Sequence, residues 1–152
     1  MKTLIVYFSK SGRTKKIAEG IAEISGGDLH EIKTEKEYPK NYFMTLIASK
    51  REFSNQECPS LIDNTIKDFE SYERILIGFP IWFGTCPMAV ISFLKKYDFN
   101  GKSIYPFCTS AAGGCTKAKN DIEKNCAGKV FDGLKANRVT KEKISEWLNE
   151  TK

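Results

Sequence analysis

Histidine is almost absent from this chain, and its cysteines lack the spacing of a metal site. The 152 residues contain one histidine, His30, and five cysteines: Cys58, Cys86, Cys108, Cys115 and Cys126. No Cys-x-x-Cys pair occurs, so the combined cysteine and histidine spacing of zinc sites is missing. We therefore expect no metal centre, and the odd cysteine count predicts reduced and mostly buried thiols.

Long apolar runs are missing as well. No segment approaches the roughly 20 apolar residues of a membrane-spanning helix, and the first residues enter a strand pattern without the layout of a signal peptide. We expect a cytoplasmic protein that does not bind membranes. The hydrophobic content of 41% and the charged content of 28% are ordinary, and the length predicts a single domain over residues 1–152.

The motifs of several nucleotide- and phosphate-handling classes do not occur. Neither G-x-x-x-x-G-K-S/T nor G-x-G-x-x-G is present, which argues against P-loop nucleotide hydrolysis and Rossmann dinucleotide binding. No cysteine begins the Cys-x5-Arg motif of a low-molecular-weight phosphatase. A receiver domain needs an aspartate at the end of its central strand, where this chain has Gly78, Phe79 and Pro80.

Acidic residues are fewer than basic residues, and the formal net charge is +5. The lysines are spread along the chain, with small basic groups at Lys15-Lys16, Lys50-Arg51 and Lys95-Lys96. We interpret them as a solvated basic surface. No basic and aromatic motif indicates a nucleic-acid interface, so no nucleic-acid partner is expected.

What the chain does contain is a regular alternation of strand and helix patterns. Strands are expected at the apolar or alternating runs 2–8, 28–33, 74–79, 103–109 and 129–134. Helices are expected at the amphipathic stretches 12–24, 87–96, 117–125 and 140–149. This alternation predicts a three-layer α/β/α fold, a doubly wound five-stranded parallel sheet with helices on both faces.

The segment 36–64 interrupts the alternation. It is long, irregular and rich in aromatic and charged residues. We expect one short helix around residues 41–50 within it and a shorter helix over 64–70 after it.

Three loops follow the carboxyl ends of predicted strands, where open parallel sheets bind their ligands. The first loop, residues 9–14, offers hydroxyls, Gly12 and the first N–H groups of a helix, a combination that suits an anion such as phosphate. The second, residues 80–87, places Trp82 and Phe83 in a turn bounded by prolines. The third, residues 109–116, has small residues before Cys115, which leaves room for a flat ligand.

Each loop also has a simpler interpretation when it is taken alone. Residues 9–14 could be a helix cap and turn, the aromatic side chains of the second loop could fold into the core, and the third loop could be a plain turn. Cys86 and Cys115 are interpreted as small, semi-buried residues without redox activity, and His30 as a surface residue. The three loops in this order nevertheless predict one shared cleft at the edge of the sheet.

These loops resemble those of the flavodoxin-like FMN proteins, particularly the small stand-alone flavodoxins, and the resemblance covers nearly the whole chain. The hydroxyl-x-hydroxyl-Gly-x-Thr pattern is matched by Ser9, Ser11, Gly12 and Thr14. The Pro-Ile-Trp-aromatic-Gly-Thr pattern is matched by residues 80–85, and the Thr-Ser-small-small-Gly-Gly pattern by residues 109–114. The resemblance implies a flavodoxin-like sheet with strand order 2-1-3-4-5.

The resemblance also implies that FMN is the cofactor. Its phosphate would lie on the first loop, and its isoalloxazine ring would lie between the second and third loops. No catalytic side chain is implied, because the flavin supplies the redox chemistry. The residues implied to bind the cofactor are Ser9, Lys10, Ser11, Gly12, Arg13, Thr14, Pro80, Ile81, Trp82, Phe83, Gly84, Thr109, Ser110, Ala111, Ala112, Gly113, Gly114 and Cys115.

The implied function is electron transfer between redox partner proteins, by a monomer or weak dimer. The alternative is a small FMN-dependent NAD(P)H reductase acting on quinones or similar acceptors, and a third possibility is a degenerate fold that has lost its cofactor. We favour the electron-transfer protein because the sequence shows no separate nicotinamide-binding motif. The chain departs from the family pattern at Arg13, where asparagine is common, and at Phe83, where a second tryptophan is common. Its charge of +5 also contrasts with the acidic character typical of electron-shuttling flavodoxins.

Overall fold

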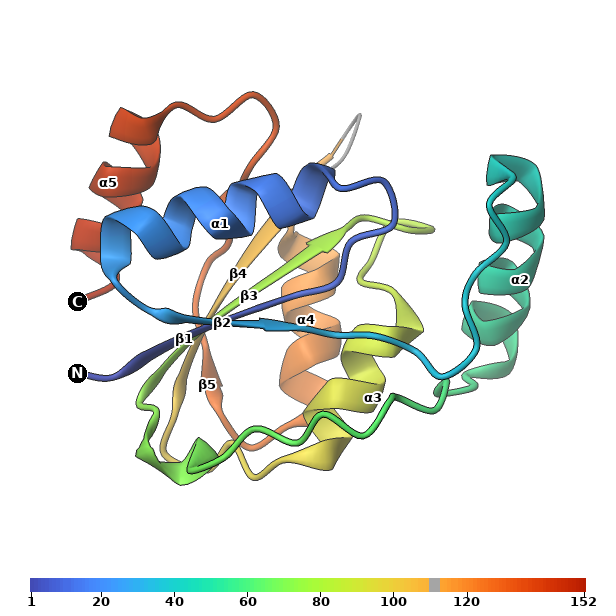
Figure 1. Cartoon of the computed structure of the whole chain (residues 1–152), viewed down its shortest axis with the longest axis horizontal. Coiled ribbons are helices and arrows are strands. Elements are labelled where there is room, and N and C mark those ends of the chain that lie inside the picture. The colour runs from blue at the N-terminus through green and yellow to red at the C-terminus, as the bar shows by residue number, and fades with distance from the viewer. Residues whose placement is uncertain (110–112) are drawn as a thin grey trace.

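A parallel β-sheet with helices on both faces forms the body of the protein (Figure 1). The computed structural model describes residues 1–109 and 113–152. Its strands are β1 (Thr3–Tyr7), β2 (Asp28–Glu31), β3 (Arg74–Pro80), β4 (Ser103–Thr109), β5 (Lys129–Val130) and β6 (Leu134–Lys135). The order is β2-β1-β3-β4-β5, with β6 also paired to β4, and all of these pairs are parallel. The fold class and strand order expected from the sequence are confirmed.

The helices are α1 (Arg13–Ser25), α2 (Tyr42–Asn55), α3 (Met88–Lys96), α4 (Thr116–Asn125) and α5 (Lys141–Glu150). Figure 1 shows α1 and α5 on one face of the sheet and α3 and α4 on the other. Helix α2 stands beyond the carboxyl ends of the strands, while both termini lie at the opposite end of the sheet. Within the two described ranges, no helix is both long and apolar enough to cross a membrane.

Alternate side chains of the central strands enter two separate hydrophobic cores. Leu4 and Val6 of β1 pack toward α3 and α4, whereas Ile5 packs toward α1 and α5. All three side chains are almost fully buried. Because helices cover both faces, the strands read as continuous apolar runs, and this is why β1, β3 and β4 were recognisable from the sequence.

The helix expected over residues 64–70 does not form, and only a short 3₁₀ turn, η1 (Phe69–Ser71), is present there. Backbone groups in this segment are engaged elsewhere, since the Ile66 N–H donates to the Tyr97 hydroxyl at 3.0 Å. Asp68 also adopts a left-handed conformation with φ of 53°. Tertiary contacts and this local turn replace the helical hydrogen bonds.

Other boundaries differ from the expectation by a few residues. Helix α2 continues to Asn55, where Gln56 in the left-handed conformation ends it without the glycine that usually marks such a stop. The weak last strand is divided into β5 and β6, which pair with different parts of β4. Pro87 precedes α3 as its N-cap instead of being its first residue.

Gly78 in the central strand β3 is a position where any side chain would collide with Phe107. A Cβ atom at Gly78 would lie 2.1 Å from Cε2 of the Phe107 ring, and that ring is fully buried. Because the surrounding core is close-packed, Gly78→Ala is expected to lower the free energy of unfolding by about 3 kcal/mol. Urea denaturation monitored by circular dichroism measures this loss.

Gly20→Ala in helix α1 is the matched control, since a Cβ there would meet nothing within 4 Å. It is expected to raise the free energy of unfolding by about 0.5–1 kcal/mol, because alanine favours the helix. Equal stability of the two variants would contradict the packing described for β3 and β4.

Candidate functional site

The first loop joins β1 to α1 through a turn that leaves the helix start open. Gly12 is the N-cap with φ of 90°, and no side chain caps the helix. The Ser9 hydroxyl accepts a hydrogen bond from the Gly12 N–H at 3.1 Å, which fixes the turn. The first turn of α1 contains no acidic residue, and Arg13, Lys15 and Lys16 lie there. Free N–H groups, the helix dipole and these cations all favour an anion at this position.

Thr109, at the end of β4, connects the three loops at one edge of the sheet. Its hydroxyl is 3.0 Å from the hydroxyl of Thr14 in the first loop, and both side chains are buried. Its carbonyl accepts a hydrogen bond from the Ile81 N–H of the second loop at 2.8 Å. These two contacts bring the first and second loops together at the start of the third.

The second loop makes a tight turn that displays two aromatic side chains. Trp82 and Thr85 exchange backbone hydrogen bonds of 2.8 and 3.1 Å, while Phe83 and Gly84 between them have φ of 53° and 79°. The half-buried indole of Trp82 packs edge-to-face against Phe8, with 5.4 Å between ring centroids. Since Phe8 precedes Ser9, the indole lies beside the first loop.

Two aromatic residues of the segment 36–64 complete this region and were missed by the sequence analysis. Tyr38 packs edge-to-face against Trp82 with a centroid distance of 5.4 Å, and Phe53 of α2 stacks on Phe83 at 5.7 Å. The Tyr38 hydroxyl donates to the Glu52 carboxylate at 2.5 Å. Burial, and then this carboxylate, raise the pKa of Tyr38, so the phenol stays protonated. The aromatic content of the segment was the signal that could have revealed these contacts.

The third loop is described in part. Ser110, Ala111 and Ala112 lie outside the described residues, whereas Gly113 and Gly114 are exposed and Gly113 has φ of 82°. Cys115 is buried as the N-cap of α4.

Cys115 is bonded to Cys108 of β4 in a disulfide, with 6.1 Å between the Cα atoms. The expectation of reduced thiols is wrong for this pair, because the end of β4 and the start of α4 bring the two cysteines together. Cys58, Cys86 and Cys126 are free.

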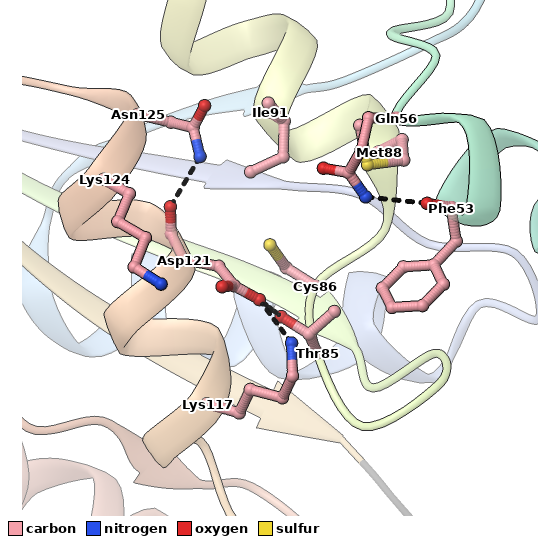
Figure 2. A pocket seen from close by; sticks show the side chains of 10 residues that line it. All are labelled: Phe53, Gln56, Thr85, Cys86, Met88, Ile91, Lys117, Asp121, Lys124 and Asn125. Atoms are coloured by element: carbon pink, nitrogen blue, oxygen red, sulfur yellow. Dashed lines mark hydrogen bonds and ion pairs between the residues drawn. The ribbon is translucent and has the colours of Figure 1, made fainter.

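A cavity of about 240 Å³ lies behind the second loop, between α2, α3 and α4 (Figure 2). The Asp121 carboxylate accepts hydrogen bonds from Thr85 at 2.5 Å and from Lys117 at 2.9 Å. Burial opposes ionisation of Asp121, but these partners outweigh it and hold its pKa below the ordinary value. Thr85 and Cys86 line the cavity, whereas none of the residues implied to bind the cofactor does.

The free thiols are expected to differ in reactivity because their burial differs. Cys86 points into this cavity (Figure 2) but is only 2% exposed, and burial raises its pKa to about 12. Cys58 is partly exposed, and the ammonium of Lys95 lies 3.5 Å from its sulfur. Labelling of the native protein with N-ethylmaleimide at pH 8, followed by peptide mass spectrometry, should modify Cys58 first and Cys86 only after unfolding. Equal labelling rates at the two positions would contradict this packing.

The strand order and the anion-favouring turn after β1 define a doubly wound α/β protein, a class whose ligands lie at the carboxyl ends of the strands. The model of the flavodoxin family matches residues 2–151, and the chain belongs to this family. No match is found among curated proteins.

Solved structures show the same fold over almost the whole chain. A candidate flavoprotein from Bacteroides eggerthii DSM 20697 has 25% identity and a TM-score of 0.87, covering 99% of this chain and 97% of that chain. One from Bacteroides uniformis ATCC 8492 has 30% identity and a TM-score of 0.87, with 97% of each chain covered. A flavoprotein from Lactobacillus acidophilus NCFM, solved in complex with FMN, has 30% identity and a TM-score of 0.74, covering 88% of this chain and 91% of that chain.

Proposed function

We propose that this protein binds FMN at the carboxyl edge of its sheet and carries electrons between redox partners. The observation on which this depends is the position of Thr109, which joins the first and second loops through its hydroxyl and its carbonyl. Membership of the flavodoxin family supports the proposal, as does the FMN complex of the similar flavoprotein from Lactobacillus acidophilus.

The donor set of the first loop fits a phosphate. Gly12 leaves open space above the helix start, because a Cβ atom there would meet nothing within 4 Å. We assign the phosphate to the N–H groups and side chains of this turn, with the Thr14 hydroxyl fixed by Thr109 and the Ser9 hydroxyl by Gly12. The residues in this role are Ser9, Lys10, Ser11, Gly12, Arg13 and Thr14.

The second and third loops would orient the flavin ring. Trp82 has its indole fixed between Phe8 and Tyr38, so it can present a defined surface to a planar ligand. Backbone groups of Pro80, Ile81, Gly84, Gly113 and Gly114 complete this part of the proposed site. Ser110, Ala111 and Ala112 are assigned to it by the sequence motif alone. Bound flavin would supply the redox chemistry, and the protein would set its orientation and exclude water.

An absorbance spectrum of the purified protein tests the proposal. Bands near ~375 and ~450 nm, together with quenching of added FMN fluorescence, are expected of a bound oxidised flavin. A colourless protein that leaves FMN fluorescence unchanged would contradict the proposal and favour a fold that has lost its cofactor.

Anaerobic addition of NADPH or NADH distinguishes an electron carrier from a stand-alone reductase. We expect the flavin absorbance to persist when no partner protein is present. Rapid bleaching by the nicotinamide alone would show instead that the protein is an FMN-dependent reductase.

A further inference from the structure

We propose that the Cys108–Cys115 disulfide is a thiol–disulfide exchange site, and that its opening by a dithiol weakens FMN binding. The second half of this inference rests on the proposed function, whereas the first half concerns the two sulfurs alone. Three observations support it: the position of the two cysteines in the fold, a cavity beside Cys115, and the residues next to each cysteine in the chain.

The bridge joins a central strand of the sheet to the start of a helix. Cys108 belongs to β4, which is paired to β3 on one side and to β6 on the other, so its position does not depend on the disulfide. Cys115 is seven positions further along the chain, at the start of α4. The covalent bond therefore holds the start of α4 against the end of the sheet.

Both ends of the bridge adjoin residues assigned to the flavin. Thr109 follows Cys108 directly and holds the first two loops together. Gly113 and Gly114 precede Cys115 directly, and both are exposed at the proposed ring site. Opening the bridge leaves Thr109 fixed by the sheet but releases the covalent anchor beside the two glycines. Loss of this preorganisation weakens the binding of a ligand that needs them in place.

A cavity lies beside one of the two bridged residues. It has a volume of about 160 Å³ and is lined by Cys115, Thr116, Lys119, Asn120, Asp132 and Gly133. Cys115 is 6% exposed, whereas Cys108 is 0% exposed. The ammonium of Lys119 and the carboxylate of Asp132, 2.8 Å apart, form an ion pair at the cavity wall. Of the two bridged residues, Cys115 lines this cavity and Cys108 does not, so the incoming thiolate approaches the bridge from the Cys115 side.

The exchange needs a dithiol, which supplies two electrons. One thiolate of the reductant attacks Sγ of Cys115, the S–S bond breaks, and Cys108 leaves as a thiolate that takes up a proton. The second thiol of the reductant then attacks its own sulfur in the mixed disulfide and displaces Cys115. The reductant ends as a disulfide and the protein as two thiols, with the Cys115 sulfur at the amino end of α4, where a thiolate is stabilised.

Titration of FMN into the apoprotein, followed by flavin fluorescence, tests the coupling. The oxidised protein and protein treated with dithiothreitol and desalted under argon are compared, and circular dichroism confirms that both are folded. We expect reduction to raise the Kd for FMN at least about tenfold, and reoxidation to restore it. Cys115→Ser should bind FMN weakly with or without dithiothreitol. Cys58→Ser, which keeps the bridge and removes a free thiol, should respond like the natural protein.

Several results would overturn the inference. They are a Kd that changes less than twofold on reduction, loss of the fold on reduction, or intact-mass data showing no disulfide in the air-oxidised protein. Treatment of the Cys108→Ser variant with oxidised glutathione adds a site-specific test, because no Cys108 thiol can then resolve the mixed disulfide, which should form at Cys115 as well as at the partly exposed Cys58. If neither redox form binds FMN, the proposed function fails, and the site of glutathione addition still decides the reactivity of the bridge.

Discussion

Replacing Ser11 with aspartate is expected to weaken FMN binding by about 100- to 1,000-fold. Ser11 is exposed in the first loop, one residue before the Gly12 N-cap. A carboxylate there would compete for the free N–H groups of α1 and repel the phosphate. Two unit charges 4 Å apart near a protein surface interact by about 4 kcal/mol, and partial screening leaves about 3–4 kcal/mol for a doubly charged phosphate.

Riboflavin provides the internal control, because it carries the same ring without the phosphate. Its affinity for Ser11→Asp should stay within about twofold of the value for the natural protein, since no charge repulsion is involved. Ser11→Asn has nearly the same shape as the aspartate variant and no charge, and should lose less than about fivefold in FMN affinity. If Ser11→Asp weakens FMN and riboflavin equally, the phosphate is not bound at this loop.

Electron transfer between this protein and an acidic partner is expected to slow at least about tenfold as salt is raised from 10 to 500 mM. The formal net charge is +5, and the first turn of α1 has no acidic residue. A positive field beside the proposed phosphate site would steer an acidic protein toward it and repel a basic one. Photoreduced [2Fe–2S] ferredoxin of the acidic plant type serves as the probe, with FMN kept saturating and the rate followed by flavin absorbance.

Charge reversal at two different places separates the effect of the local field on the rate from the effect of the net charge. Lys15→Glu/Lys16→Glu changes the formal charge from +5 to +1 at the first turn of α1, beside the proposed phosphate site. Lys67→Glu/Lys129→Glu makes the same change at the amino ends of the strands, since Lys67 lies just before η1, which contacts Lys102 ahead of β4, and Lys129 begins β5. The first pair should abolish most of the salt dependence and the second should retain most of it. A rate that rises with salt in the natural protein would show that the docking surface is acidic.

The central fold was predictable because the determinants of its strands are local. β1, β3 and β4 are apolar on both faces, and their two-sided burial is what continuous hydrophobic runs indicate. Gly26 ends α1 in a left-handed conformation, and the Thr140 hydroxyl accepts a hydrogen bond from Lys143 at the start of α5, as their residue types suggest. The family motifs of the loops then supplied the rest of the site hypothesis.

The features that escaped prediction depend on contacts between distant parts of the chain. The disulfide exists because β4 and α4 place Cys108 and Cys115 close together, which no cysteine spacing in the sequence indicates. Tyr38 and Phe53 reach Trp82 and Phe83 only because the segment 36–64 folds against the second loop. Residues 64–70 have a helix-like pattern, but a hydrogen bond to Tyr97 and a local turn set their backbone conformation instead.

Backbone amide NMR of the ¹⁵N-labelled apoprotein during an FMN titration tests the central claim most directly. We expect the largest chemical-shift changes at residues 9–14, at 81–84 and at Gly113 and Gly114, with riboflavin leaving the first of these groups nearly unchanged. Changes confined to the cavity behind the second loop, around Asp121 and Asn125, or no changes at a saturating FMN concentration, would contradict it.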